Sequence, residues 1–314
     1  AQYPQDYLIL IFIVVLLLPI TSVSQILQQS FQGIKAIALF SLFSGLARLL
    51  TFCLLLLVML MTETLTLNLA LFVFIGATFI SLCLALLIWR KQHNHSYFSM
   101  DNHEKQSLML KMKNSCISLW GVSCLAIVMA DGVQIMVGIF SEPSQAAFFA
   151  VAMRVASLVA FILLAINGIL SPKFAELSVE NNLHRLQNVY RSATRLMILV
   201  TSPILVMIFI FADDLLLIFG EQFPQASVVL RILVVAQFFK VAVGSVGQLL
   251  IMTGNEKCQR NNLFFSVLVL MILCVLLIPS YGAFGGAIAT LCAVAMNNLL
   301  GLYQVKRKLS ITLF

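Results

Sequence analysis

Apolar stretches long enough to cross a lipid bilayer recur along the whole chain, and this feature limits the possible folds more than any other. About 20 apolar residues in a helix cover the hydrocarbon core of a membrane, which is roughly 30 Å thick. Only 10% of the 314 residues are charged, whereas soluble proteins average about 25%. We predict nine membrane-spanning helices, over residues 7–26, 36–61, 67–89, 115–139, 147–170, 195–219, 226–253, 263–280 and 283–303. The fold class is therefore an all-α polytopic membrane protein, with no room for a soluble catalytic or nucleic-acid-binding domain.

The last two stretches are separated only by the turn PSYG at 279–282. Small residues follow this turn, and they predict a close approach of this helix to a neighbour. They are Gly285, Gly286, Ala287 and Ala289. Another connection, 171–195, carries apolar residues at helical spacing among basic ones. This pattern is typical of an amphipathic helix that lies at the membrane surface.

Positive charge occurs in every second connecting segment. Of the 19 Lys and Arg residues, 15 lie in the segments around residue 35, at 90–113, 173–195 and 257–260, and in the tail at 306–308. The intervening segments contain acidic residues and neither Lys nor Arg. Because cytoplasmic loops carry the excess of Lys and Arg, the C-terminus is predicted to be cytoplasmic and residue 1 to lie on the outer side.

The polar stretch 90–114 is the longest connection and predicts a cytoplasmic boundary between two helical lobes. Residues 1–89 are then the last three helices of an N-terminal lobe, and residues 115–314 form a six-helix C-terminal lobe. A weak repeat relates SQILQQSFQGIK at 24–35 to GQLLIMTGNEK at 247–257, in the fourth helix of the second lobe. We therefore expect twelve helices in the complete protein, with three before residue 1. An N-terminally truncated piece of this kind is not expected to transport by itself.

Five ionisable residues fall within the predicted spans, when Arg195, Asp213 and Asp214 toward the ends of the span 195–219 are counted with the flanking segments. Asp131 and Arg154 lie at the same depth on adjacent antiparallel helices. Two explanations remain open for them: a structural ion pair, or a carboxylate that couples transport to an ion or acts as a gate.

The other three charges in the spans are cations without an acidic partner. Arg48 and Lys240 lie near the bilayer midplane, one in each lobe, where repeated-lobe transporters bind substrate. Such cations favour an anionic ligand, and Arg suits a phosphate. Arg231 lies close to the outer edge, where snorkelling to the surface explains it as well. Gln25 and Gln248 line the same predicted cavity or hydrogen-bond between helices. These five residues are the candidate substrate-binding set.

No motif indicates an enzyme. The sequence contains no phosphate-binding Walker loop, HExxH or GxSxG pattern, and its Cys and His residues have no metal-ligand spacing. We therefore predict no catalytic residues, no metal and no cofactor.

An ordered set of segments resembles the second lobe of the Wzx-type polysaccharide flippases, in the multidrug, oligosaccharidyl-lipid and polysaccharide exporter superfamily. The segments are ADG at 130–132, AFFAVAMRV at 147–155, LSPKFAEL at 170–177, FGEQF at 219–223, TGNEK at 253–257 and YGAFGGA at 281–287. The resemblance implies two six-helix lobes that rock about a central cationic cavity. It also implies export of undecaprenyl-pyrophosphate-linked oligosaccharide units of O-antigen, capsule or exopolysaccharide across the bacterial inner membrane, with ion coupling in some relatives.

Two alternatives stay open at the level of the sequence. A multidrug exporter of the same superfamily is expected to carry acidic groups in its cavity, since its substrates are commonly cationic. A membrane-embedded polymerase or glycosyltransferase needs a large outer loop with catalytic side chains, and the outer segments here are short. The expected partners are the lipid-linked oligosaccharide, membrane lipids, a glycan polymerase and a chain-length regulator, with no nucleic acid.

Overall fold

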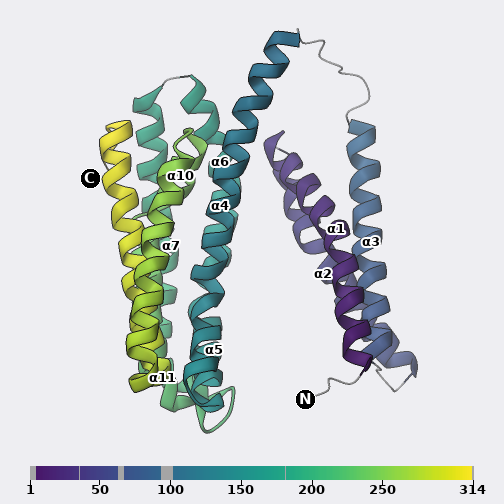
Figure 1. The fold of residues 1–314 in the computed structure, drawn as a ribbon, viewed down its shortest axis with the longest axis vertical. Coiled ribbons are helices and arrows are strands. Elements are labelled where there is room, and N and C mark those ends of the chain that lie inside the picture. The colour runs from purple at the N-terminus through teal and green to yellow at the C-terminus, as the bar shows by residue number, and fades with distance from the viewer. Residues whose placement is uncertain (1–4, 35, 63–66, 93–101, 181, 313–314) are drawn as a thin grey trace. The chain divides into compact units, whose positions relative to one another are not determined.

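The structure is a computed structural model that describes residues 5–34, 36–62, 67–92, 102–180 and 182–312. Within these ranges the chain forms α-helices and one short 3-10 helix, without a strand. It divides into two compact units, Ala1–Met100 and Asp101–Phe314 (Figure 1). Seven helices in the described ranges are long and apolar enough to cross a membrane. The predicted all-α, multi-span architecture is therefore confirmed, although the number of nine helices is only approximate.

The first unit contains α1 (Gln5–Gly33), α2 (Ile37–Thr62) and α3 (Leu67–Gln92), and each of these helices packs against the other two. Its small core is aromatic. The ring of Phe31 stacks on Phe43 at a centroid distance of 5.6 Å and meets the edge of Trp89 at 5.4 Å. Edge-to-face and offset pairs of this kind are favourable beyond the area that they bury. They hold α1 against α2 and α3.

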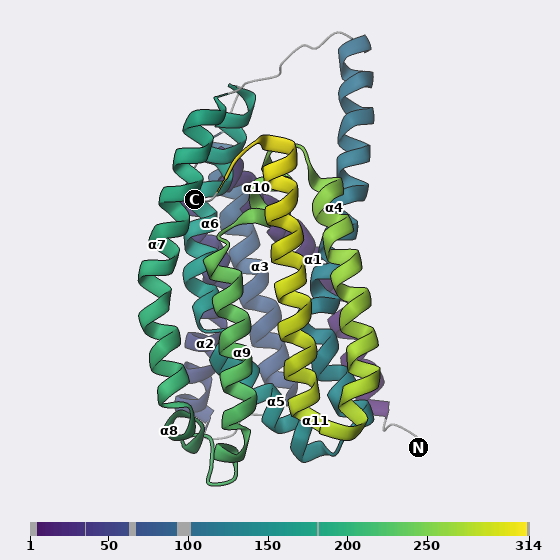
Figure 2. The same cartoon turned by 90° about the vertical axis from the view of Figure 1, so that its left-hand side faces the viewer.

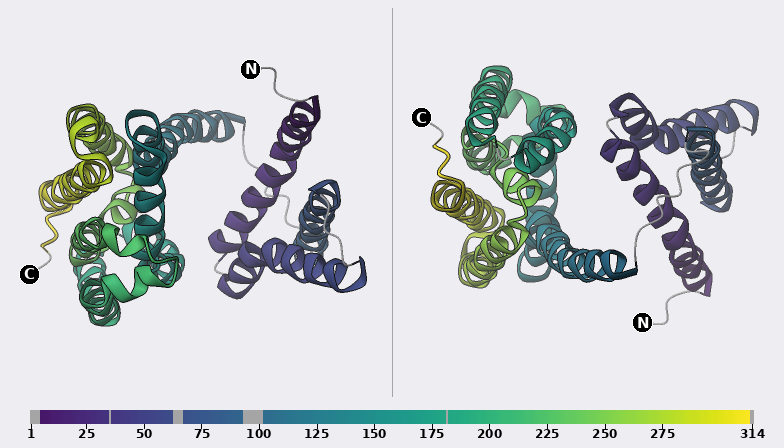
Figure 3. Two further views of the ribbon diagram at one scale, coloured as in Figure 1. Left: turned by 90° about the horizontal axis from the view of Figure 1, so that it is seen from below. Right: turned by 90° about the horizontal axis from the view of Figure 1, so that it is seen from above.

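The second unit is a helical bundle, seen along its helices in Figure 3 and from the side in Figure 2. Its core is a single cluster of buried apolar side chains that includes residues of α5, α6, α7, α9 and α11. The elements of this unit are α4 (Asn102–Phe140), α5 (Pro143–Ala156), α6 (Val159–Val179), α7 (Leu183–Ile210), α8 (Ala212–Leu217), η1 (Phe223–Ala226), α9 (Ser227–Ala242), α10 (Val246–Met252) and α11 (Glu256–Leu309).

The long element α11 covers the last two predicted stretches and turns back on itself at Gly282, which has φ +52°. Its two arms are joined by a reciprocal amide pair between Asn262 and Gln304, at 3.1 and 2.7 Å. The predicted close approach after the turn is confirmed. A methyl group added to Gly286 would lie 2.9 Å from Cγ2 of Val137 on α4. Only a hydrogen at this position allows α11 and α4 to pack at this distance.

Several predicted helix ends are wrong. The helix predicted from residue 115 begins at Asn102, because the preceding polar segment contains helix-forming Lys, Leu, Met and Gln without Gly or Pro. The helix predicted over 147–170 is instead α5 and α6, which continue through Pro172 to Val179. The helix predicted over 195–219 ends at Ile210 and is followed by the short α8.

The predicted amphipathic surface helix within 171–195 is also wrong. Residues from Leu183 onward are the first turns of α7, a single helix of 28 residues. The apolar side chains that suggested a membrane-surface helix point into the bundle, since Leu186 is 0% and Tyr190 is 1% exposed. The same buried stripe continues along α7 through Met197 and Leu205. Bundle helices and surface helices share this periodicity, so the pattern did not distinguish them.

Candidate functional site

The stretch predicted as one helix over 226–253 is interrupted at residues 243–245, between α9 and α10. An interruption frees backbone N–H and C=O groups, which are costly in a membrane unless other protein groups bond to them. One replacement comes from α7, where the hydroxyl of Tyr190 donates a hydrogen bond to the carbonyl oxygen of Val243 at 2.6 Å. Discontinuous helices near the bilayer midplane are typical of substrate and ion sites in transporters. The broken helix is therefore the first component of the candidate site.

Gly244 makes the interruption possible. Its φ of +72° is a left-handed conformation that residues with a side chain rarely adopt. The space beside it is also filled, because a methyl group at this position would collide with the side chain of Thr194 on α7. Thr194 is itself fixed, since its hydroxyl donates to the carbonyl oxygen of Tyr190 at 2.9 Å. Sterics and backbone conformation both require glycine here.

A second set of polar contacts joins the broken helix to α6. The hydroxyl of Ser245 donates to Oδ1 of Asn167, and Nε2 of Gln248 donates to Oγ of Ser171 at 2.8 Å. Ser171 in turn donates to the backbone carbonyl oxygen of Asn167 at 2.6 Å. Gln248, a predicted substrate ligand, therefore makes the helix-to-helix hydrogen bond that the sequence left as its alternative. Its contact with substrate stays a prediction.

Lys240 lies roughly midway between Ser227 and Met252, four residues before Gly244. It comes three residues after Gln237 and seven after Leu233, both of which are buried. This spacing places Lys240 on the stripe of α9 that packs into the bundle. Its side chain is nevertheless exposed. Lys240 therefore reaches the surface of the second unit, at the edge of the stripe that packs into the bundle.

The remaining predicted ligands of the first unit are less informative. Gln25 is exposed on α1. The backbone of Arg48 lies in α2, but its side chain is outside the described part of the structure. The cavity that Arg48 is predicted to share with Lys240 therefore stays a prediction.

Arg231 has a partner that the sequence did not predict. Its Nη2 donates to Oδ2 of Asp213 at 2.6 Å, and its Nε donates to the carbonyl oxygen of Phe209 at 3.3 Å. Asp213 lies in the first turn of α8, after α7 has ended. Hydrogen bonding by Ser227, together with the Arg231 guanidinium, holds the pKa of this carboxyl below its ordinary value. Arg231 therefore ties α9 to the outer connection and is not an unpaired cation.

The predicted ion pair between Asp131 and Arg154 is not formed. Across the described side chains the structure contains two ion pairs, Lys173 with Glu176 and Arg231 with Asp213. Asp131 on α4 and Arg154 on α5 are both exposed. Equal depth on adjacent helices did not bring the two side chains into contact, because the rotation of each helix about its axis also decides which residues meet.

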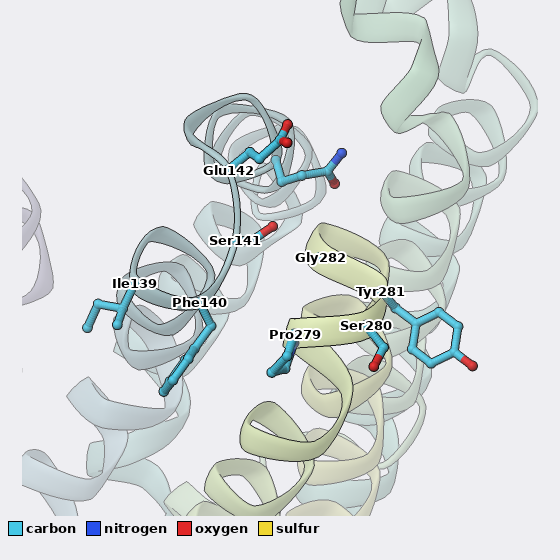
Figure 4. Close-up of a pocket in the computed structure, with 9 residues that line it drawn as sticks. Ile139, Phe140, Ser141, Glu142, Pro279, Ser280, Tyr281 and Gly282 are labelled. Atoms are coloured by element: carbon cyan, nitrogen blue, oxygen red, sulfur yellow. The ribbon is translucent and has the colours of Figure 1, made fainter.

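A polar pocket of about 710 Å³ lies between the α4–α5 junction and the turn of α11 (Figure 4). Ser141 and Glu142 line it from the junction, opposite Gly282. The Oε1 atom of Gln145 accepts a hydrogen bond from the backbone N–H of Ala283 at 3.2 Å, which fixes the turn. The pocket lies at the end of the bundle that the charge pattern places outside, far along α4 from its basic start.

Sequence reasoning missed Tyr190, Gly244 and Ser245. One signal was available, since the predicted stretch over 226–253 is longer than the roughly 20 residues that a straight helix needs to cross the membrane. The motif VGSVG at 243–247 lies within that excess length and contains two helix-weakening glycines. No comparable signal marked Tyr190, because its role depends on a contact between residues 53 positions apart.

Comparison with known proteins agrees with this architecture. The family model MatE matches residues 118–276, about half of the chain. A curated relative, the probable low-salt glycan biosynthesis flippase of Haloferax volcanii, is 26% identical over 177 residues. That match covers 56% of this chain and 38% of the relative.

Two solved structures share the fold. A mutant of the Vibrio cholerae MATE transporter VcmN superposes with a TM-score of 0.71 and 13% identity over 91% of this chain and 66% of that one. A MATE protein in the straight conformation gives a TM-score of 0.64 and 16% identity over 86% of this chain and 62% of that one. The chain thus spans only 38% of the curated relative's length and less than two thirds of the VcmN chain.

MatE proteins and the flippase relative are transporters and not enzymes, which rules out the alternative of a glycan polymerase or glycosyltransferase. The match over half of the sequence and the all-helical bundle agree with one another. The chain belongs to the MatE family of membrane transporters.

Proposed function

We propose that the complete protein containing this chain flips a lipid-linked oligosaccharide across the bacterial inner membrane by alternating access. The observation that carries the proposal is Lys240, a cation on the core-facing stripe of α9 with an exposed side chain. A charge at this depth is expensive unless it faces a cavity or a partner. An anionic group of the substrate, such as the pyrophosphate that links a glycan to its lipid carrier, is a suitable partner for it.

The flippase relative supports a glycan substrate, since it is described as a probable glycan biosynthesis flippase. In the proposed mechanism the pyrophosphate binds Lys240 and, from the other lobe, Arg48. The lipid chain remains in the bilayer while the sugars enter the cavity. The cations 306–308 of the C-terminal tail then lie in the cytoplasm, as the positive-inside rule predicts. A glycan polymerase and a chain-length regulator are the proposed protein partners.

The interruption of α9 and α10 next to Lys240 supports a moving site. Residues 243–245 make side-chain hydrogen bonds with α6 and α7 in addition to local backbone bonds, such as the one from the N–H of Gly244 to the carbonyl oxygen of Val241 at 2.9 Å. Such contacts can be exchanged as the lobes rock, whereas a continuous helix resists bending. We infer that α10 changes its angle to α9 during transport.

A multidrug exporter is the second candidate function. Two observations favour it: the structural likeness to MATE transporters, and Asp131, an exposed carboxylate within α4 that is a candidate for proton or sodium coupling. The two candidates differ in the charge of the substrate. A flippase requires the positive charge of Lys240, whereas an exporter of cationic drugs is impeded by it.

The test measures the amount of surface glycan on cells that lack the chromosomal gene for the protein and express variants of the complete protein instead. Lys240→Met is expected to reduce surface glycan about tenfold or more, as expected for the loss of a hydrogen bond to a charged group. Lys240→Arg keeps the charge and should retain most export, and Lys306→Met, at the exposed end of α11, is the matched control. Lipid-linked glycan should accumulate when Lys240 is lost, with an unchanged amount of protein in the membrane.

A normal amount of surface glycan in Lys240→Met cells contradicts the flippase proposal. Resistance to cationic dyes that depends on the protein, and that rises in Lys240→Met cells, would instead favour the multidrug exporter.

A further inference from the structure

An apolar groove of about 440 Å³ runs between α6 and α7, which lie side by side in Figure 2. Ile166 and Leu170 line it from α6, and Val189 and Leu196 line it from α7. The groove is separate from the broken helix and from Lys240, because none of those residues contributes to its wall. A groove lined in this way, on the flank of a membrane bundle, suits a hydrocarbon chain.

The groove becomes polar toward the turn between α6 and α7, where Asn188 and Ser192 contribute to its lining. Beyond this point, two cations lie on the same faces of α6 and α7 that line the groove. Lys173 follows Ile166 by seven residues on α6, and Arg185 precedes Ser192 by seven residues on α7. A separation of seven residues is two helical turns along one face. Both cations therefore lie in line with the groove, at its basic end.

The two cations are available to a ligand. Arg185 is exposed, and the side chain of Lys173 is 48% exposed although its Nζ lies 3.5 Å from Glu176 Oε1. Ion pairs that are exposed to this extent are weak, so a phosphate can replace the carboxylate. The positive-inside rule places this end of the bundle at the cytoplasmic leaflet, where anionic lipids attract Lys and Arg.

We propose that the groove between α6 and α7 binds one acyl chain of an anionic phospholipid, whose phosphate contacts Lys173 and Arg185. The apolar walls select a chain of hydrocarbon, and the two cations select a negatively charged headgroup over a zwitterionic one. The proposal depends on neither the transported substrate nor the cavity at Lys240, and it stands if the protein exports drugs instead of glycans.

The test is native mass spectrometry of the complete protein in detergent, with phosphatidylglycerol and phosphatidylethanolamine added separately. The wild-type protein is expected to retain one phosphatidylglycerol and to prefer it over phosphatidylethanolamine. The double variant Lys173→Gln/Arg185→Gln should bind phosphatidylglycerol about thirtyfold more weakly, because each cation near a membrane surface contributes about a factor of five. Lys306→Gln/Arg307→Gln, which removes two exposed cations from the end of α11, is the matched control and should change binding by less than about twofold.

A second variant tests the groove separately from the charges. Ser192→Phe places a ring in the groove from an exposed position and should reduce retention of phosphatidylglycerol, whereas Leu268→Phe on the exposed face of α11 should not. Equal retention of the two lipids, an equal loss in the α11 control pair, or normal retention by Ser192→Phe would each overturn the proposal and indicate only non-specific annular lipid.

Discussion

The hydroxyl of Tyr190 on α7 donates a 2.6 Å hydrogen bond to the carbonyl oxygen of Val243, at the point where α9 stops. The ring of Tyr190 is buried, with 1% of its surface exposed. This single contact satisfies a backbone group that the broken helix leaves free. The position of the break therefore depends on α7 as much as on the sequence of α9.

Replacing Tyr190 with Phe should reduce stability by about 1–3 kcal/mol, because the carbonyl oxygen of Val243 loses its donor while the packing of the ring is kept. Thermal unfolding of the purified protein in detergent measures this loss. Tyr303→Phe is the control, since Tyr303 is 60% exposed and should change stability by less than about 0.5 kcal/mol. An equal effect of the two substitutions would show that the Val243 contact contributes nothing.

Replacing Gly244 with Ala should be more harmful than replacing Gly254 with Ala. Both glycines have left-handed backbones, with φ of +72° and +75°, so each substitution costs about 1–2 kcal/mol. A methyl group at Gly244 also collides with Thr194, whereas nothing lies within 4 Å of a methyl group at Gly254. The difference between the two variants in thermal unfolding measures this collision.

The collision has its own control. Adding Thr194→Ala to the Gly244→Ala variant should recover part of the lost stability, and the backbone strain should remain. If the double variant is no more stable than Gly244→Ala alone, the steric explanation is wrong.

The ion pair between Asp213 and Arg231 predicts a dependence of stability on pH. The pKa of Asp213 is lowered in the folded protein from its ordinary value of 3.8, first by the Ser227 hydrogen bond and then by Arg231. A depressed pKa stabilises the fold above the ordinary value, and this stabilisation is lost as pH falls through the folded pKa. The stability difference between the wild-type protein and Asp213→Asn should therefore be largest at neutral pH and shrink below about pH 4.

Unfolding temperatures of both proteins at several pH values test this expectation. Asp214→Asn is the matched substitution, since Arg231 contacts Asp213 and not its neighbour. A difference between wild type and Asp213→Asn that stays constant from neutral to acidic pH would contradict the assigned role of Asp213.

Replacing Asp131 with Asn should change the ion dependence of transport while leaving the stability of the protein almost unchanged. Asp131 is exposed and forms no ion pair with Arg154 in the described structure, so Asp131→Asn should change stability by less than about 0.5 kcal/mol. If Asp131 couples transport to an ion, the same variant should lose the pH or sodium dependence of export in vesicles. Arg154→Gln, which removes the cation of the predicted pair, is the comparison. A large loss of stability in both variants, with unchanged ion dependence, would restore the structural ion pair.

Some features followed directly from the sequence. Hydrophobic length alone identified a multi-pass helical protein, because a chain in a bilayer must satisfy its backbone hydrogen bonds within helices. The turn before Ala283 and the close approach at Gly286 were also predictable, since Pro279 and the small residues that follow are local signals. The charge pattern also predicts which residues lie at each surface, through a rule that needs no contacts, and this orientation stays a prediction.

Only the tertiary structure decided which polar groups meet. The equal depth of Asp131 and Arg154 suggested an ion pair. Among the cations predicted within the spans, however, it is Arg231 that contacts a carboxylate, that of Asp213. Likewise the apolar residues after Leu183 are spaced as in a helix at the membrane surface, but the burial of Leu186 shows that this segment belongs to the bundle. Depth and periodicity follow from position along one helix, whereas contact depends on the rotation of a helix and on its neighbours, which are set by packing among residues far apart in the sequence.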